Sequence, residues 1–323
     1  MTGAPAPADT RIAPSPISGP DSEEAWPMDA LQRIEQALAA ALDLGLADDG
    51  PPKLARAVRH AVLTPGSRAR PRLLLAVADA CGDDAPAVSD AAAASLELLH
   101  CASLVHDDMP VFDDADTRRG APTVHRLFAQ HGEQLALLTG DGLIVLAFEN
   151  LAWHSRTHPQ RLAPLTLIIA RAVGVGHGIV AGQAWECETD VDLTQYHREK
   201  TAALFSAATA AGAAAAGMEP APWCTLGENL GLAYQVADDL RDVAGDAAAL
   251  GKPIGQDATH ARPSAVSQLG INGAIARLEE LLTAAVDAIP DCPGRAKLAA
   301  MAQAEMERLL PAQLRAAPRV PRP

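Results

Sequence analysis

Two groups of aspartates interrupt long apolar segments that have the character of helices. The first group ends one such segment and the second lies inside another, and together they comprise Asp107, Asp108, Asp113, Asp238, Asp239 and Asp242. Carboxylates in an apolar setting repel one another and lose hydration, which is costly unless cations compensate them. The fold must therefore bring cations to both groups, and a single cavity with two facing acidic walls meets that requirement.

The remainder of the sequence favours helices around such a cavity. Apolar residues make up 49% of the chain and aromatic residues only 3%, with many alanines. Alanine is the best helix former and a poor strand former, and no segment alternates as a strand does. We predict an all-α domain over residues 28–310, with helices near residues 29–44, 51–63, 71–81, 88–108, 124–130, 134–155, 159–173, 194–216 and 226–243, and two or three more before residue 310.

Charge, cysteines and the two ends of the chain narrow the class of protein. The formal charge of −14 disfavours general nucleic-acid binding, which needs a basic surface. Five cysteines without a C-x-x-C pair indicate reduced thiols, and no membrane span or signal segment is recognisable, so we expect a cytoplasmic protein. Residues 1–27 and 311–323 are rich in proline without apolar periodicity and are predicted to be disordered.

The acidic groups have the features of a magnesium site. Pro110 ends the first helix, so Asp107 and Asp108 lie in its last turn, where the helix dipole attracts cations. Asp238 and Asp242 are four residues apart and share one helix face. Mg²⁺ binds a few carboxylates and keeps other positions for water and substrate phosphates. All six aspartates are predicted ligands; the alternative for the second group is a solvated acidic face.

Arginines lie close to the predicted metal site. Arg118 and Arg119 follow the first acidic group, and the segment Gly66-Ser67-Arg68-Ala69-Arg70 precedes a helix that begins near Pro71. The guanidinium fork matches phosphate oxygens, and a helix N-terminus adds positive potential. Each motif alone is also compatible with an ordinary charged loop. Together with the acidic groups they predict a diphosphate substrate.

These motifs resemble a known family. Residues 100–120, which end in Arg118-Arg119-Gly120, resemble the first aspartate-rich region of trans-isoprenyl diphosphate synthases (polyprenyl synthetases), and residues 234–242 resemble the second. Four shorter motifs also occur in the order that the family has, at residues 66–71, 182–183, 200–201 and 251–253. The resemblance therefore covers roughly residues 30–305. Residues 181–186, 191–193 and 196–197 resemble the geranylgeranyl diphosphate synthases of bacterial carotenoid and bacteriochlorophyll pathways.

The resemblance implies an isoprenoid synthase fold, a homodimeric helical bundle around a deep central cavity. It implies Mg²⁺-dependent head-to-tail condensation of isopentenyl diphosphate with dimethylallyl, geranyl or farnesyl diphosphate, giving geranylgeranyl diphosphate and pyrophosphate. The family suggests about three Mg²⁺ ions per site, with Mn²⁺ as a substitute. The ions would stabilise the leaving diphosphate, the isopentenyl double bond would attack the allylic cation, and pyrophosphate would accept the released proton.

The resemblance also implies roles for individual residues. Lys200, Thr201 and Gln235 would stabilise the cation and bind the allylic substrate, with Arg118 and Lys252. The isopentenyl diphosphate site would comprise Arg70, His100 and Arg119, together with Ser67 and Arg262, two positions at which the family usually has lysine. We expect Arg68, Arg70 and Arg72 to compensate for the charge missing at Ser67.

The length of the product is predicted from the residues before Asp107. Ser103 and Ala102 lie about one helical turn deeper than Asp107, and Leu99 lies another turn down. Small side chains there leave room for a C20 chain, whereas an aromatic would favour C15. A farnesyl diphosphate synthase, a longer-chain synthase, a terpene cyclase and a non-catalytic regulatory subunit of the same fold are the alternatives. Ser67 is the one feature that favours the regulatory subunit.

Overall fold

The computed structural model describes residues 28–244 and 264–309. Several predictions fall outside these ranges, namely the disordered ends at residues 1–27 and 311–323 and the substrate contacts of Lys252 and Arg262. The described residues form a helical bundle, which confirms the predicted all-α class. Its elements include α1 (Met28–Gly45), α2 (Pro52–Leu63), α3 (Ala69–Ala80), α4 (Pro86–Asp107), α5 (Gly132–His154), α6 (Pro159–Val173), α7 (Ile179–Ala184), α8 (Leu193–His197), α9 (Ala203–Ala215), α10 (Cys224–Ala244), α13 (Ala265–Asp287) and α14 (Arg295–Leu309).

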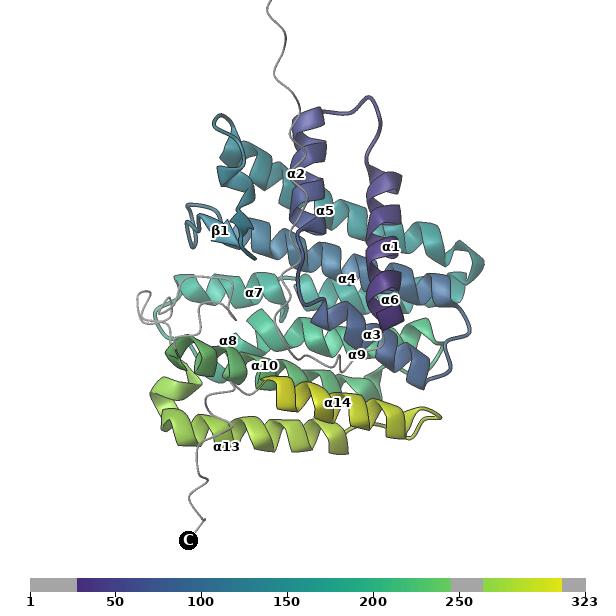
Figure 1. The fold of residues 1–323 in the computed structure, drawn as a ribbon. Helices are drawn as coiled ribbons and strands as arrows, with labels where there is room; N and C mark the ends of the chain where they lie inside the picture. Colours follow the sequence, from purple (N-terminus) through teal and green to yellow (C-terminus); the bar gives the residue numbers. More distant parts are fainter. Residues whose placement is uncertain (1–27, 245–263, 310–323) are drawn as a thin grey trace, which may run out of the picture.

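Helix α4 is the central element of the bundle. It crosses the middle of the molecule beside α5, while α13 and α14 lie on the side away from α2 (Figure 1). Its alanines and leucines are buried nearly all the way round, which allows other helices to pack closely against it. Polar contacts fix α5 on it, because Ser95 donates a hydrogen bond to the Ala147 carbonyl at 2.7 Å and Asn150 donates to the Ala91 carbonyl at 3.0 Å.

Two helical segments of the described chain are long and apolar enough to cross a membrane. They are Pro86–Asp107, in which an apolar 18-residue window is 78% buried inside the bundle, and Gly132–Thr157, in which the corresponding window is 44% buried. The burial of the first segment accounts for its apolar character as a core helix. The second segment has an exposed apolar face and forms part of the surface considered below.

The segment that follows the first acidic group differs from the prediction. Instead of a helix at residues 124–130, a single 3₁₀ turn spans Val124–Arg126, and α5 begins at Gly132. Before it, β1 (Thr117–Arg118) and β2 (Ala121–Pro122) form a small antiparallel hairpin. Arg119 and Gly120 have φ values of +54° and +76°, as in the type I′ turns that suit two-residue hairpin loops. Strands of two residues are too short to show alternation in the sequence.

The helix predicted at residues 194–216 is also interrupted. A π-helical turn, Arg198–Ala202, separates α8 from α9 and contains Lys200 and Thr201. Gly182 of α7 lies directly against this turn, and a side chain there would collide with the Lys200 backbone. Single π turns inside helices are frequent at functional sites, because they displace side chains from the regular helical register.

Candidate active site

A cavity of about 1030 Å³ opens between α4, α5, α7 and α10. Most of the predicted site residues within the described chain line it, namely Arg70, Leu99, His100, Ala102, Ser103, Asp107, Asp113, Arg118, Lys200, Thr201, Gln235, Asp238 and Asp239. Asp108 and Arg119 line a small adjoining pocket instead. Ser67 is exposed and outside the cavity, and Asp242 is buried outside its lining.

The first acidic wall is formed by the end of α4 and the loop after it. The loop folds back so that the Asp113 backbone N–H donates to the Asp107 carbonyl at 3.0 Å. The Oδ1 atom of Asp107 is buried and accepts no hydrogen bond, and the nearest cation there is Lys200, whose Nζ lies 3.8 Å away. Burial raises the pKa of Asp107. This carboxylate is therefore poorly compensated and suited to bind a cation.

Asp108 lies behind this wall and is engaged by Arg118. The Arg118 Nε donates to Asp108 Oδ1 at 2.9 Å, and the Arg118 guanidinium also lies 3.9 Å from Asp107. Burial raises the pKa of Asp108 to about 6, although Arg118 opposes the shift. Arg118 in β1 thus supports the acidic wall and faces the cavity at the same time.

The second acidic wall belongs to α10. Asp238 faces the cavity, whereas the buried Asp239 carboxylate accepts hydrogen bonds from Gln235 Nε2 at 2.9 Å and from the Ala265 backbone N–H at 2.7 Å. The second of these bonds fixes α10 to the start of α13. Gln235 in turn accepts a hydrogen bond from the Thr201 hydroxyl at 2.8 Å, which joins this wall to the π turn.

The donor set fits Mg²⁺. Carboxylate oxygens are hard ligands, and Asp107 Oδ1 is a buried oxygen without a hydrogen bond. Within residues 28–244 and 264–309, no three acidic, histidine or cysteine side chains converge closely enough to hold an ion by themselves. Mg²⁺ does not require such a cage, since it retains waters and binds substrate phosphates. The two walls therefore match ions that a diphosphate would bridge.

Lys200 is held at the edge of the acidic walls. Its Nζ forms a close ion pair with Glu186, which also accepts a hydrogen bond from the Tyr196 hydroxyl at 2.7 Å. Glu186 therefore fixes the direction of Lys200 toward Asp107. We did not predict a role for Glu186 from the sequence, because the two residues come from separate helical segments.

Arg70 and His100 form the basic side of the cavity. Arg70 Nη1 lies 3.2 Å from His100 Nε2, and its guanidinium stacks on the Phe205 ring at 4.6 Å from the centroid. Burial lowers the pKa of Arg70, and burial together with the nearby arginines lowers the pKa of His100 well below its usual value. His100 is thus neutral and accepts the Arg70 hydrogen bond. The buried Arg70 Nε has no hydrogen-bond partner, which fits an anion site.

One expectation about the basic segment is wrong. Arg68 does not replace the charge missing at Ser67, because its side chain is fully buried and bonded to Glu35 and Glu97. Arg68 precedes α3 with a left-handed backbone, φ 50° and ψ 31°, and points into the bundle. Arg72 does not line the cavity either, so Arg70 alone of the three arginines reaches it.

The deep end of the cavity is apolar. Leu99, Ala102 and Ser103 line it from α4, and the Ser103 hydroxyl is satisfied by the His100 carbonyl at 2.8 Å. Further apolar residues that we did not predict from the sequence line the same cavity, namely Ile144 from α5, Val173 from α6 and Ile179 from α7, together with Leu137, whose carbonyl lies 3.3 Å from His106 Nε2 near the acidic end. The cavity therefore offers apolar surface for a hydrocarbon chain.

Comparisons with known proteins identify the family. The polyprenyl synthetase family model matches residues 51–299. The chain is 55% identical over 285 residues to a geranylgeranyl diphosphate synthase of Cereibacter sphaeroides (88% of this chain, 98% of the relative) and 51% identical over 272 residues to one of Rhodobacter capsulatus (84% and 93%). A Helicobacter pylori geranyltransferase crystallised with magnesium and isoprenyl diphosphate superposes with a TM-score of 0.73 at 29% identity, covering 91% of this chain and 98% of that one. The chain belongs to the polyprenyl synthetase family.

Proposed function

We propose that this protein is a Mg²⁺-dependent prenyltransferase that condenses isopentenyl diphosphate with allylic diphosphates to give geranylgeranyl diphosphate and pyrophosphate. One observation carries the proposal: a single cavity is lined by aspartates of both acidic walls, on α4 and α10, and by the apolar Leu99 and Ala102 of α4. Such a cavity suits a substrate with a diphosphate at one end and a hydrocarbon chain at the other. The relatives named geranylgeranyl diphosphate synthase support the C20 product.

The metal ligands are assigned to the aspartates that face the cavity. Asp107, Asp113 and Asp238 are the principal ligands, with Asp108, Asp239 and Asp242 supporting the two walls. Bound Mg²⁺, about three ions as the family suggests, would neutralise the leaving diphosphate. Arg118 and Lys200 face the same space, so their charges add to the stabilisation of the leaving group.

The π turn supplies the groups nearest the reacting carbon. The Thr201 hydroxyl donates a hydrogen bond to Gln235. The lone pairs of the hydroxyl oxygen therefore remain available toward the cavity. Oxygen dipoles of this kind stabilise a developing allylic cation. Lys200 completes the allylic site, and Lys252 would join it from outside the described residues.

The isopentenyl diphosphate site is assigned to Arg70, His100 and Arg119. Arg70 and His100 line the cavity, and Arg119 lies directly behind them. Ser67 is exposed and offers at most a hydroxyl contact, which places more of the binding on the two arginines. Arg262, outside the described residues, would be a further cationic contact.

Homodimer formation is part of the proposal. Leucine and valine side chains are exposed along α5 and α6, with Leu137, Leu138 and Val145 at 49, 52 and 66% and Leu167 at 54%. Neighbouring exposed apolar side chains of this size mark contact surfaces. A second copy that covers this face would also close the α5 side of the cavity, which Leu137 and Ile144 line. The cytoplasmic location predicted from the sequence belongs to the same proposal.

The decisive experiment is a product assay. Purified protein, Mg²⁺ and labelled isopentenyl diphosphate are incubated with dimethylallyl, geranyl or farnesyl diphosphate, and the products are sized by chromatography. We expect C20 from each allylic partner and no product in excess EDTA. A dominant C15 product would identify a farnesyl diphosphate synthase, and no product from any partner would favour the regulatory subunit. Conversion of an allylic diphosphate without isopentenyl diphosphate would indicate a terpene cyclase.

A further inference from the structure

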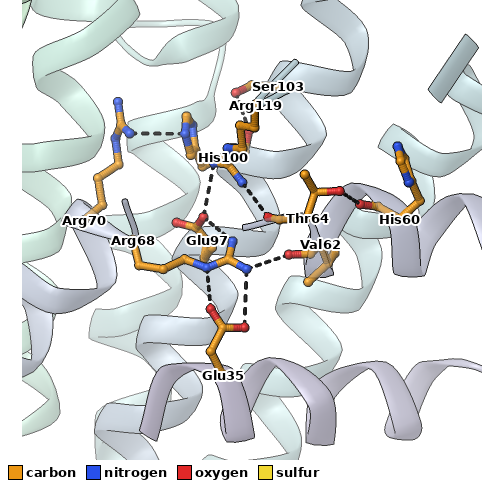
Figure 2. A network of polar contacts seen from close by, with 10 residues as sticks. All are labelled: Glu35, His60, Val62, Thr64, Arg68, Arg70, Glu97, His100, Ser103 and Arg119. Atoms are coloured by element: carbon orange, nitrogen blue, oxygen red, sulfur yellow. Dashed lines mark hydrogen bonds and ion pairs between the residues drawn. The ribbon is translucent and has the colours of Figure 1, made fainter. Parts of the chain in front are cut away.

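A buried carboxylate lies behind the proposed isopentenyl diphosphate site. Glu97 is on α4, one turn before His100, and is 1% exposed (Figure 2). Its Oε1 accepts a hydrogen bond from Arg68 Nη1 at 2.8 Å and lies 3.5 Å from Arg119 Nη2. One carboxylate oxygen therefore joins two arginines from different segments of the chain.

Arg68 is fully engaged within the protein. Its Nε donates to Glu35 Oε1 at 2.8 Å, its Nη2 donates to the Val62 carbonyl at 2.7 Å, and its Nη1 donates to Glu97. Each nitrogen of this guanidinium has a protein acceptor, so Arg68 has no function as a substrate contact. Its charge instead compensates Glu97, which a buried carboxylate requires in order to remain ionised.

Glu97 is the acidic partner of Arg119. It lies in the turn of the β1–β2 hairpin and has a left-handed backbone. Its guanidinium packs over Gly66, where an added Cβ would lie 2.5 Å from Arg119 Cζ. Its hydrogen-bond partners are neutral: the Thr64 carbonyl, 3.4 Å from Nη1, and the Cys101 side chain. Without Glu97, the direction of this side chain depends on these neutral contacts and on packing.

We propose that Glu97 is a positioning residue of the isopentenyl diphosphate site, acting through Arg119; this inference rests on the proposed function. The cluster of Arg68, Arg70, Arg119, Glu35 and Glu97 carries three positive and two negative charges, which leaves an excess for an anion (Figure 2). Glu97 holds Arg119 beside Arg70 although the two guanidinium groups repel each other.

Two effects of removing the Glu97 charge oppose each other. The local potential becomes more positive, which attracts a diphosphate, and Arg119 loses its ion pair, which lets the repulsion from Arg68 and Arg70 displace it. Displacement dominates, because the hydrogen bonds left to Arg119 are to the neutral Thr64 and Cys101, and the buried arginines are poorly screened from one another. Glu97→Gln should therefore weaken the binding of isopentenyl diphosphate, whereas a purely electrostatic role would strengthen it.

The test is a comparison of Michaelis constants in the full-length protein. We expect Glu97→Gln to raise the KM for isopentenyl diphosphate roughly tenfold, as for loss of one charge-assisted contact to the substrate when Arg119 is displaced, with the KM for farnesyl diphosphate unchanged. Glu35→Gln is the matched control, since Glu35 contacts Arg68 but has no contact with Arg119 and is half-exposed. Its KM for isopentenyl diphosphate should change by less than about twofold.

A double-mutant cycle separates this role from a merely structural one. If Glu97 acts through Arg119, Glu97→Gln should have no further effect on this KM in an Arg119→Gln background. Additive increases would overturn the inference, as would a lowered KM in the single Glu97→Gln variant. Equal losses in kcat for all substrates with unchanged KM would show a stability effect and would also overturn it.

The outcomes distinguish this inference from the proposed function. If Arg119→Gln itself leaves the KM for isopentenyl diphosphate unchanged, the assignment of that site fails and Glu97 fails with it. If Arg119→Gln raises the KM and Glu97→Gln does not, only the positioning role is overturned. Should Glu97→Gln fail to fold, Glu97→Asp is the alternative variant, because it keeps the charge and shortens the side chain by one methylene group. A KM increase in that variant supports positioning, and an unchanged KM contradicts it.

Discussion

The charged end and the deep end of the cavity share helix α4 but are built by different means. At the charged end, several functional side chains are fixed by specific partners, as Arg118 fixes Asp108 and Glu186 fixes Lys200. At the deep end, Leu99, Ala102 and the residues opposite them are fixed only by packing. The chemistry should therefore depend on individual contacts, whereas product length should depend on volume. Mutations at the charged end should leave product length unchanged, and mutations at the deep end should leave the chemistry unchanged.

The largest expected effect is at Asp107. Asp107→Asn keeps the shape of the side chain and removes a charge that faces the cavity, so we expect kcat to fall by about 10²–10³, as for loss of a preorganised charge-stabilising group. The residual product should still be C20, because Leu99, Ala102 and Ser103 are unchanged. Asp49→Asn removes the same charge from an exposed loop and is the control. A shorter product from Asp107→Asn would break the separation between the two ends.

The second prediction concerns the pH dependence of stability at the charged end, in the metal-free protein. Burial lowers the pKa of His197 to about 4, so the unfolded chain takes up this proton first and stability falls as the pH drops below about 6.5. The pKa of Asp108 is raised to about 6, so the folded protein takes up that proton first and gains stability as the pH drops through 6. Each effect amounts to about 3 kcal/mol at most.

Single variants separate these opposing contributions. Relative to the unsubstituted protein, His197→Gln should become more stable as the pH is lowered from 7 to 4.5, and Asp108→Asn should become less stable. Urea unfolding in EDTA at a series of pH values measures both. Parallel pH profiles for the two variants and the unsubstituted protein would contradict the prediction. Ala102→Ser at the deep end introduces no titratable group and is expected to follow the parent profile.

The third prediction distinguishes the roles of Asp238 and Asp239, two neighbouring aspartates of α10. Asp239 is bonded to Gln235 and to the start of α13, so Asp239→Ala should lower the free energy of unfolding by about 2 kcal/mol, the usual cost of losing charged hydrogen bonds. Asp238 faces the cavity and is less buried, so Asp238→Ala should lower activity with a smaller loss of stability. Thermal or urea unfolding without Mg²⁺ compares them. Equal destabilisation would show that both aspartates have structural roles.

The acidic walls were predictable from the sequence because aspartates inside an apolar helical segment are energetically unfavourable, and a few neighbouring residues are enough to show this. Asp107 and Asp238 occur in apolar helices, and Pro110 marks the helix end, so each signal lies within a few residues. The contact between Glu97 and Arg119 was not predictable in this way, since its members come from α4 and a hairpin turn. The π turn at Lys200 was missed for a related reason: it arises where α7 packs closely against the segment, and the local sequence reads as one continuous helix.

The deep wall was predicted only in part. The position of Ala102 follows from its spacing to Asp107 on a regular helix. Leu137 and Ile144 belong to α5, whose apolar residues are spread around the helix, so periodicity does not show which of them face the cavity. The side of the deep end opposite α4 therefore became known only from the packing of α5, α6 and α7.

The smallest effect in energy is expected at this deep end, although it changes the product. Ala102→Tyr and Ser103→Phe place an aromatic ring in the path of the growing chain, and we expect C15 to replace C20 as the main product. A tenfold change in the product ratio requires only about 1.4 kcal/mol of differential binding. The KM for isopentenyl diphosphate and the requirement for Mg²⁺ should be unchanged, because Asp107 and Arg70 are not altered. An unchanged C20 product in both variants would contradict the prediction that the chain grows past Ala102 and Ser103 of α4.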